Sequence, residues 1–368
     1  MFYRSGTKND FTTLLGIVGT LVVIGLLFIY SSSSIYAAQR FNSAHYFLKR
    51  QLIGVLLGFV GFFIARKVSQ EFLYVWTPAF FFGSWFLTCL TLIPQLSSRI
   101  HGSSRWLSIA GFSFQPSELL KIAFIMYLAR FLSKRKDKPF TFIAAYLPFL
   151  ILTGLVAAIL LAQPDFGLAV TLIATAVALL FITGFPLLHL TIVAGILITL
   201  AGALIYSQPY RLKRILIFLD PWKDPQGAGF QIIQSLIAIG SGSWWGSGIS
   251  HSKQKFFYLP MQHTDFIFSI IAEETGFIGS TVIVILFLLL AYYGMKIACQ
   301  LKSTFATLTT LGFTILITLQ GIINFCVATG LLPTKGIGLP FISYGNSSLI
   351  CFLCMIGIIG NFVEKTTQ

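Results

Sequence analysis

The chain has 368 residues, of which 56% are hydrophobic and 10% charged, with a formal net charge of +14 and a mean hydropathy of +0.85. Soluble domains carry about 25% charged residues, so this composition excludes a soluble globular protein. Long apolar runs recur along the chain, and each can cross a hydrocarbon core of about 30 Å. The runs are continuous rather than alternating, which excludes a membrane β-barrel. We therefore predict an all-α integral membrane protein.

Ten transmembrane helices are predicted, forming a single polytopic membrane domain over residues 1–368. In chain order the predicted spans are 11–35, 47–66, 72–94, 115–132, 141–162, 166–184, 186–206, 275–298, 304–329 and 341–362. The first apolar run is longer than that of a signal peptide, so we expect an uncleaved helix. Residues 266–298 exceed one bilayer crossing as a helix. We therefore predict that residues 265–274 lie outside the hydrocarbon, as an interfacial helix or loop.

Two connections between the predicted spans are long. Residues 95–114 are expected to form a polar loop, and residues 207–264 form a large loop between spans seven and eight. The short loops on the N-terminal side hold twelve Lys and Arg residues, and those on the other side hold six. The excess of positive charge predicts a cytoplasmic N-terminus and C-terminus, which makes the large loop extracytoplasmic.

The eleven acidic residues divide between the two predicted sides. Four lie at the cytoplasmic ends, where we expect ordinary solvated charges: Asp10, Glu71, Asp137 and Glu364. Seven lie at or near the outer face: Glu118, Asp165, Asp220, Asp224, Asp265, Glu273 and Glu274. The outer face also carries cations, which could bind a phosphate-containing ligand beside carboxylates able to move a proton. From charge alone, a solvated loop with ordinary surface charges remains an equal alternative.

Other common sites are not indicated by the sequence. The five cysteines fall in or beside apolar stretches, so we interpret them, including Cys351 and Cys354, as packing residues rather than metal or redox groups. The chain shows no zinc-ligand spacing, no Walker or Rossmann glycine motif and no hydrolase triad spacing. ATP-driven work by this chain is therefore not expected.

Glu118 begins predicted span four, where Pro116 suits the first helical turn. Lys121 lies one turn deeper and can pair with Glu118. An ionisable residue inside a span suggests function, but an ion pair that only fixes the helix is equally compatible. Asp165 is expected to cap span six, and Asp265 either caps the following helix or acts as a base near His263.

At these residues the chain resembles the SEDS family (shape, elongation, division and sporulation) of membrane glycosyltransferases. The matching segments are Gly102–Leu107, Gln115–Lys121, Gln163–Gly167, Pro209–Arg211, Asp220–Trp222, Gly229–Gln231, Lys255–Phe268, Glu273–Gly276, Leu332–Gly336 and Pro340–Gly345. The resemblance covers nearly all of the chain. Within it, Pro333–Gly336 indicates the cell-division branch, FtsW, rather than the elongation branch, RodA.

The resemblance implies a peptidoglycan polymerase that uses lipid II. Asp265 would be the catalytic residue, deprotonating the sugar 4-hydroxyl of lipid II, which attacks the growing lipid-linked glycan with inversion and release of undecaprenyl diphosphate. The residues expected to bind the substrate are Arg105, Glu118, Lys121, Asp165, Arg211, Arg214 and Lys255. Most of these are cations that could stabilise the leaving diphosphate. A divalent cation, Mg or Mn, could accompany the diphosphate, although no dedicated cage is evident.

The resemblance also implies partners and a location. We expect a class B penicillin-binding transpeptidase and other division proteins as partners, no nucleic acid, and a place in the cytoplasmic (inner) membrane at the septum. Two positions depart from the family pattern: Met261 replaces a usual Glu, and Asn346 replaces a usual Gly in a turn that Asn could preserve in the left-handed conformation. The alternatives are a lipid II transporter, an elongation-type polymerase and a non-catalytic division scaffold.

Overall fold

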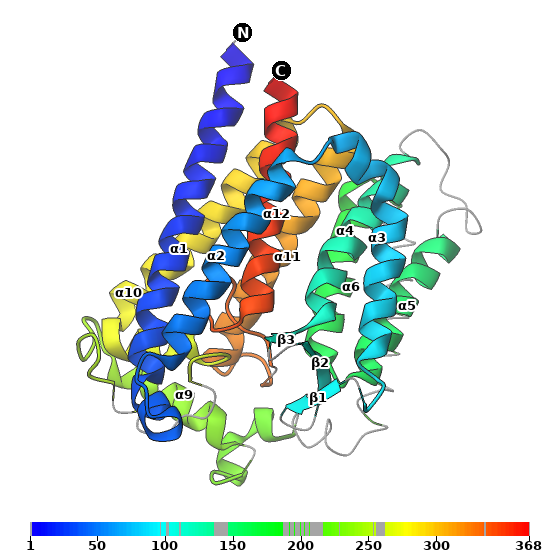
Figure 1. Ribbon diagram of the computed structural model, residues 1–368. Coiled ribbons are helices and arrows are strands. Elements are labelled where there is room, and N and C mark those ends of the chain that lie inside the picture. Colours follow the sequence, from blue (N-terminus) through cyan, green and yellow to red (C-terminus); the bar gives the residue numbers. More distant parts are fainter. Residues whose placement is uncertain are drawn as a thin grey trace.

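The structure, a computed structural model, is a bundle of long helices whose two termini lie at the same end (Figure 1). It describes residues 2–95, 97–100, 103–109, 112–135, 146–186, 216–227, 229–252, 254, 262–334 and 336–367, with single positions between 191 and 206. A small sheet and a short helix lie at the opposite end of the bundle (Figure 1).

The described helices follow the predicted spans closely. They are α1 (Phe2–Phe41), α2 (Tyr46–Lys67), α3 (Gln70–Leu90), α4 (Pro116–Ser133), α5 (Leu147–Ala162), α6 (Phe166–Ile182), α9 (Phe230–Ser241), α10 (Ile267–Gln300), α11 (Thr304–Ala328) and α12 (Asn346–Thr367). Nine predicted spans each coincide with one of these helices, and the seventh, 186–206, lies mostly outside the described residues. The multi-pass helical prediction is therefore confirmed, whereas the count of ten stays a prediction.

Six helices in the described part of the chain are long and apolar enough to cross a bilayer: α1, α2, α3, α10, α11 and α12. Helices α5 and α6 are apolar but shorter. Helix α4 contains three charged residues, Glu118, Lys121 and Arg130, which lower its hydropathy. Its buried residues nevertheless lie on all sides, as expected for a helix enclosed by its neighbours rather than by lipid.

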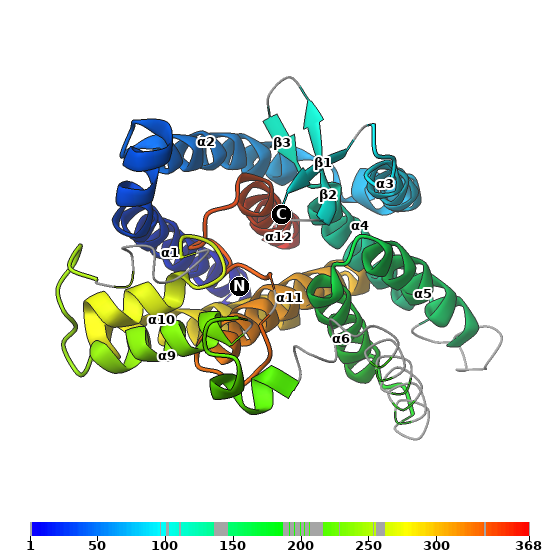
Figure 2. The same ribbon diagram turned by 90° about the horizontal axis from the view of Figure 1, so that it is seen from below.

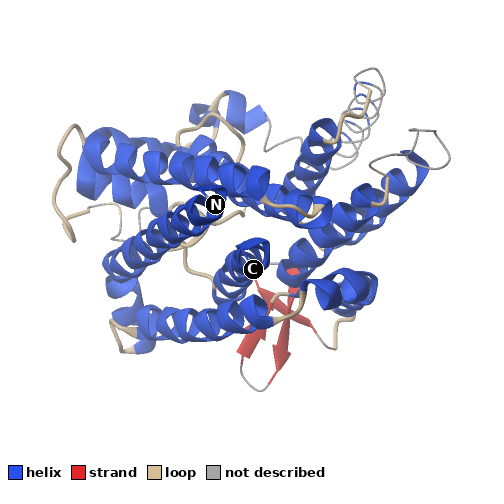
Figure 3. Cartoon of the chain, turned by 90° about the horizontal axis from the view of Figure 1, so that it is seen from above, coloured by secondary structure: helices blue, strands red, loops and turns tan. Residues whose placement is uncertain are grey.

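Helix α12 is the centre of the bundle, enclosed by α1, α2, α4 and α11 (Figures 2 and 3). Its closest approach is to α2, where a Cβ at Gly54, Gly58 or Gly61 would collide with a side chain of α12. Small residues let membrane helices pack backbone to backbone in this way. Asn346 packs against Gly54 and is the first residue of α12. The left-handed turn expected at Asn346 is therefore wrong.

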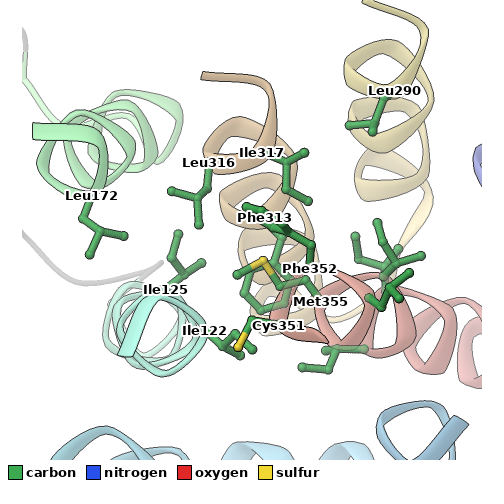
Figure 4. Packing of buried hydrophobic residues seen from close by; sticks show 14 of the residues in the cluster. Ile122, Ile125, Leu172, Leu290, Phe313, Leu316, Ile317, Cys351, Phe352 and Met355 are labelled. Atoms are coloured by element: carbon green, nitrogen blue, oxygen red, sulfur yellow. The ribbon is translucent and has the colours of Figure 1, made fainter. Parts of the chain in front are cut away.

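Aliphatic and aromatic side chains fill the centre of the bundle between α4, α11 and α12 (Figure 4). Ile125 of α4, Phe313 and Leu316 of α11, and Phe352 of α12 are each at most 1% exposed. The three helices are in direct contact through these side chains. This core therefore holds the ends of α4 and α11, which carry polar residues of the candidate site, in fixed relative positions.

Residues 95–114, predicted as a polar loop, contain a small antiparallel sheet. Its strands are β1 (Ser97–Ile100), β2 (Ser103–Ile109) and β3 (Phe112–Phe114), in the order β1-β2-β3. Leu107 of β2 pairs with Ser97 on one side and with Phe114 on the other. Short hairpins of this kind need only local pairing, so the polar composition did not reveal them. The predicted large loop, 207–264, likewise contains helix α9 and the 3-10 helix Pro221–Lys223.

Helix α10 is broken at Gly276, whose φ of 67° is in the left-handed region. Residues 243–248 supply partners for the backbone groups freed by the break. The bonds run from Ser247 N to Glu273 O (2.9 Å), Gly248 N to Glu274 O (3.0 Å), Phe277 N to Ser243 O (2.8 Å) and Ile278 N to Trp244 O (3.3 Å). Residues 267–275 thus form a separate helical segment, as predicted. Their location outside the hydrocarbon stays a prediction.

Two of the four acids expected to be solvated form ion pairs at the terminal end of the bundle. Asp10 is 7% exposed, and its carboxylate accepts from Lys296 Nζ (2.7 Å) and Gln300 Nε2 (3.0 Å). Glu364 pairs with Arg66 of α2. The prediction of an ordinary solvated charge is therefore wrong for Asp10, whereas the Glu364 side chain is 41% exposed and additionally pairs with Arg66. The single sequence did not reveal that residues nearly 300 positions apart meet at one end of the bundle.

Candidate active site

Asp265 lies at the end of the bundle opposite the termini, immediately before α10. Phe266 occupies the N-cap position of that helix and makes no capping side-chain bond. Asp265 is therefore not the N-cap residue, and the alternative that it caps the following helix is wrong. Its backbone carbonyl instead accepts a hydrogen bond from Asn324 Nδ2 of α11 (2.8 Å). The residue is half-buried, so its carboxylate is held by the protein and still meets the surface.

Gly336 separates Asp265 from a cation. A Cβ at Gly336 would lie 3.6 Å from Asp265 Oδ2 and 3.8 Å from Arg105 Nη1. The carboxylate and the guanidinium therefore flank one position that carries no side chain. Asp265 Oδ2 and Arg105 Nη1 are therefore separated by no more than the sum of these two distances. A base and a cation so placed can act on the same bound molecule.

Arg105 is held by the connection between α5 and α6. It extends from β2, and its guanidinium donates to the backbone carbonyls of Gln163 (3.2 Å) and Pro164 (2.5 Å). Its Nη1 lies 3.7 Å from Asp165 Oδ2. These contacts fix the guanidinium on the side that faces Gly336.

Asp165 caps α6, as predicted, because its Oδ1 accepts a hydrogen bond from Leu168 N (3.2 Å). Burial raises the pKa of this carboxyl above its usual value, and the nearby Arg105 guanidinium partly opposes that effect. Glu118 and Lys121 also act on the carboxyl electrostatically. The structure thus brings four of the predicted site residues into one charged cluster, formed by Arg105, Asp165, Glu118 and Lys121.

Glu118 and Lys121 form the predicted pair within the first turns of α4, with Nζ 2.5 Å from Oε2. The two groups form an ion pair whose geometry does not meet that of a hydrogen bond. Lys121 is fully buried, and its ammonium lies 4.5 Å from the ring centroid of Phe352. In this structure Lys121 therefore faces Glu118 and Phe352 rather than the surface, whereas Arg105 reaches the position beside Gly336 that Asp265 also reaches.

The segment around Asp265 is joined to the segment that carries Gly336. Ser343 Oγ donates to the carbonyl of Thr264 (2.6 Å), and Tyr344 N donates to the carbonyl of His263 (2.9 Å). The His263 ring packs against Phe47 and Tyr344, with centroid separations of 4.4 and 5.7 Å. Burial lowers the pKa of His263 to about 4, so the ring is neutral at neutral pH.

Some predicted site residues lie outside the described part of the chain, and two contacting residues were not predicted. Arg211, Arg214 and Lys255 lie outside the described residues, as does Met261. Two residues not predicted for the site, Asn324 and Gln320 of α11, donate hydrogen bonds from their amides to the Asp265 and Gly338 carbonyls, respectively. Both are polar residues inside a predicted span, and such residues often have a function in membrane helices. That signal could have identified them.

The described residues contain no group of three or more His, Cys, Asp or Glu side chains arranged to hold a metal ion. Two carboxylates of the site have partners among the described residues: Asp165 contacts Leu168 N and Arg105, and Glu118 contacts Lys121.

Comparison with known proteins gives the family. The family model for FtsW, RodA and SpoVE, described as cell cycle protein, matches residues 12–368. The chain is 44% identical over 343 residues to a protein of Geobacter sp. (strain M18) named "Probable peptidoglycan glycosyltransferase FtsW", covering 93% of each. It is 39% identical to stage V sporulation protein E of Bacillus subtilis (strain 168), covering 96% of this chain and 98% of the relative.

Solved structures share the fold over almost the whole chain. One belongs to a peptidoglycan synthase complex that coordinates polymerization and crosslinking, with a TM-score of 0.80, 30% identity, and 97% of this chain and 98% of the other covered. Another is the rod shape determining protein RodA of Thermus thermophilus, with a TM-score of 0.72, 26% identity and 97% of each covered. The chain therefore belongs to the FtsW/RodA/SpoVE family of cell cycle proteins, which is the SEDS family.

Proposed function

We propose that this protein is a peptidoglycan glycosyltransferase of the division type that polymerises lipid II. The observation that carries the proposal is the placement of the Asp265 carboxylate and the Arg105 guanidinium on either side of Gly336. The family membership and the names of the relatives, which are glycosyltransferases of the FtsW type, support the same activity.

In the proposed reaction Asp265 is the general base. It accepts the proton of the sugar 4-hydroxyl of lipid II while that oxygen forms a bond to the anomeric carbon of the growing lipid-linked glycan. The bond from that carbon to the diphosphate breaks, and its electron pair leaves with undecaprenyl diphosphate. Attack from the face opposite the leaving group inverts the anomeric configuration and forms a β-1,4 linkage.

Arg105 is the described cation best placed to stabilise the leaving diphosphate, because it faces the same open position as Asp265. Asp165 and the backbone carbonyls of Gln163 and Pro164 hold its guanidinium. Arg211, Arg214 and Lys255 are proposed to add positive charge. Glu118 and Lys121 form a buried pair whose proposed role is to support Asp165 and Arg105 electrostatically. A divalent cation, Mg or Mn, would enter with the diphosphate as part of the substrate.

We also propose that the site faces outward from the cytoplasmic membrane at the septum, with both termini cytoplasmic. The common end of the two termini and the opposite position of the site support this orientation (Figure 1). A class B penicillin-binding transpeptidase is the proposed partner, alongside other division proteins. The structural similarity to a chain of a peptidoglycan synthase complex supports such a partnership.

The test is a gel assay of glycan strands made from lipid II by purified protein, with and without the transpeptidase. Wild type is expected to make strands, and Asp265→Ala is expected to make none while remaining folded. Movement of lipid II across vesicles without strand synthesis would instead indicate a transporter. Normal division with an Asp265→Ala protein would indicate a scaffold.

A further inference from the structure

Asn324 of α11 contacts the two segments that form the candidate site. Its side chain is 1% exposed, and its Nδ2 donates to the backbone carbonyls of Asp265 and Ile337, each at 2.8 Å. Asp265 is the proposed base, and Ile337 directly follows Gly336, the residue between Asp265 and Arg105. One amide group therefore links the proposed base to the backbone beside the open position.

The neighbouring turn of α11 acts on the same segment. Gln320 lies four residues before Asn324, so both side chains project from one face of the helix. Gln320 Nε2 donates to the carbonyl of Gly338 (3.0 Å). Helix α11 thus binds the backbone of residues 337 and 338 through Asn324 and Gln320. Of these two residues, Asn324 also binds the carbonyl of Asp265.

We propose that Asn324 is a positioning residue for glycosyl transfer, which sets the Asp265 carboxylate relative to Gly336 and Arg105. This inference rests on the proposed function. Asp265 directly precedes Phe266, the N-cap of α10, whose side chain makes no capping bond, so contacts from outside that helix help to set the main-chain direction there. Removing the amide would take away one hydrogen bond from each of the two carbonyls and let the base move relative to the substrate. A displacement of about 1 Å can reduce catalysis by about 100-fold.

Asn361 of α12 provides a matched control at the opposite end of the bundle. It is also 1% exposed, and its Nδ2 also donates to two backbone carbonyls, those of Arg66 and Val68. The two amides therefore make the same kind of structural contribution. Only Asn324 does so beside Asp265.

The experiment measures kcat and KM for lipid II polymerisation by wild type, Asn324→Ala, Asn324→Ser and Asn361→Ala, together with melting midpoints and amide hydrogen exchange. We expect Asn324→Ala to lower kcat about 100-fold with KM within twofold of wild type. Asn324→Ser, which keeps one donor, should recover part of that loss. Exchange should accelerate in residues 263–269 and 336–343. Asn361→Ala should lose a similar amount of thermal stability but keep its kcat.

The proposal would be overturned by an active wild type whose Asn324→Ala variant keeps kcat within threefold. It would also be overturned if Asn361→Ala lost as much kcat as Asn324→Ala, because the effect would then be a general loss of stability. A folded wild type that makes no glycan, with or without the transpeptidase, would instead overturn the proposed function itself.

Discussion

At the residue scale, Gly336 determines how much space remains between Asp265 and Arg105. A methyl group there would make ordinary van der Waals contact with both side chains, and the backbone of Gly336 is outside the left-handed region. We therefore expect both Gly336→Ala and Gly336→Val to fold normally. The larger valine side chain should exclude substrate more strongly than the alanine methyl group. The rate of lipid II polymerisation by Gly336→Val should fall about 10- to 100-fold.

The matched control is Gly345→Ala, in the same connection. A Cβ at Gly345 would meet only Ser348 Cβ, at 3.8 Å, so this variant should keep its activity. Equal activity of Gly336→Val and wild type would show that the position over Gly336 does not hold substrate.

His263 gives the structure a predictable response to pH. Its folded pKa of about 4 lies below its ordinary value, so the folded state binds fewer protons than the unfolded state between about pH 6.5 and pH 4. The free energy of unfolding should therefore fall as the pH falls through this range, by about 1.4 kcal/mol per pH unit from this residue. Melting midpoints of the detergent-solubilised protein at pH 7.5 and pH 4.5 measure the effect.

In the His263→Phe variant the fall between these two pH values should be smaller, because the ring no longer takes up a proton on unfolding. His251→Phe, at an exposed position, should keep the wild-type fall. If His263→Phe and wild type showed the same fall, burial of His263 would not be the cause.

At the element scale, the break in α10 depends on Gly276. A Cβ there would collide with the backbone of Trp244 and Gly246, and the φ of 67° is unfavourable for other residues. We expect Gly276→Ala to destabilise the protein by roughly 1–3 kcal/mol. Gly83→Ala, in an open position within α3, should leave the melting midpoint unchanged or raised. A Gly276→Ala protein as stable as Gly83→Ala would contradict this account of the break.

The elements differ in how far the sequence predicted them. Continuous apolar runs identified nine helices because burial in lipid requires such runs. The strands at 97–114 were missed because their pairing is local and their composition is polar. The excess length of residues 266–298 correctly indicated a separate segment before α10 continues. The partner of the break, residues 243–248, could not be predicted because it comes from a distant part of the chain.

Two local contacts of the candidate site were predictable from the sequence, but its overall geometry was not. The resemblance selected Asp265 and Arg105, and local spacing selected the Glu118–Lys121 pair and the Asp165 cap. The position of Gly336 between Asp265 and Arg105 depends on three separate segments of the chain. The bond from Asn324 to Asp265 joins two segments that are 59 residues apart. Such contacts follow from packing of the whole bundle, and a single sequence contains no direct signal for them.

At the scale of the whole molecule, the two ends of the bundle carry different charge arrangements. The end with both termini has ion pairs that join helices, Asp10 with Lys296 and Arg66 with Glu364. The opposite end has a carboxylate and a guanidinium that face an open position. Ion pairs occur at both ends, since Arg105 pairs with Asp165 and Glu118 with Lys121 at the second end. Among the described contacts, a carboxylate and a guanidinium that flank a position without a side chain occur at the second end. This difference supports placing the chemistry at the second end.

The proposed mechanism depends on Asp265 acting as the base of lipid II polymerisation. The most direct measurement is the initial rate of glycan synthesis by purified wild type and Asp265→Asn, at matched melting midpoints. Loss of a general base lowers a rate by about 100- to 10,000-fold, and a drop in that range is the predicted result. An Asp265→Asn rate within tenfold of wild type, from a folded protein, would contradict the claim.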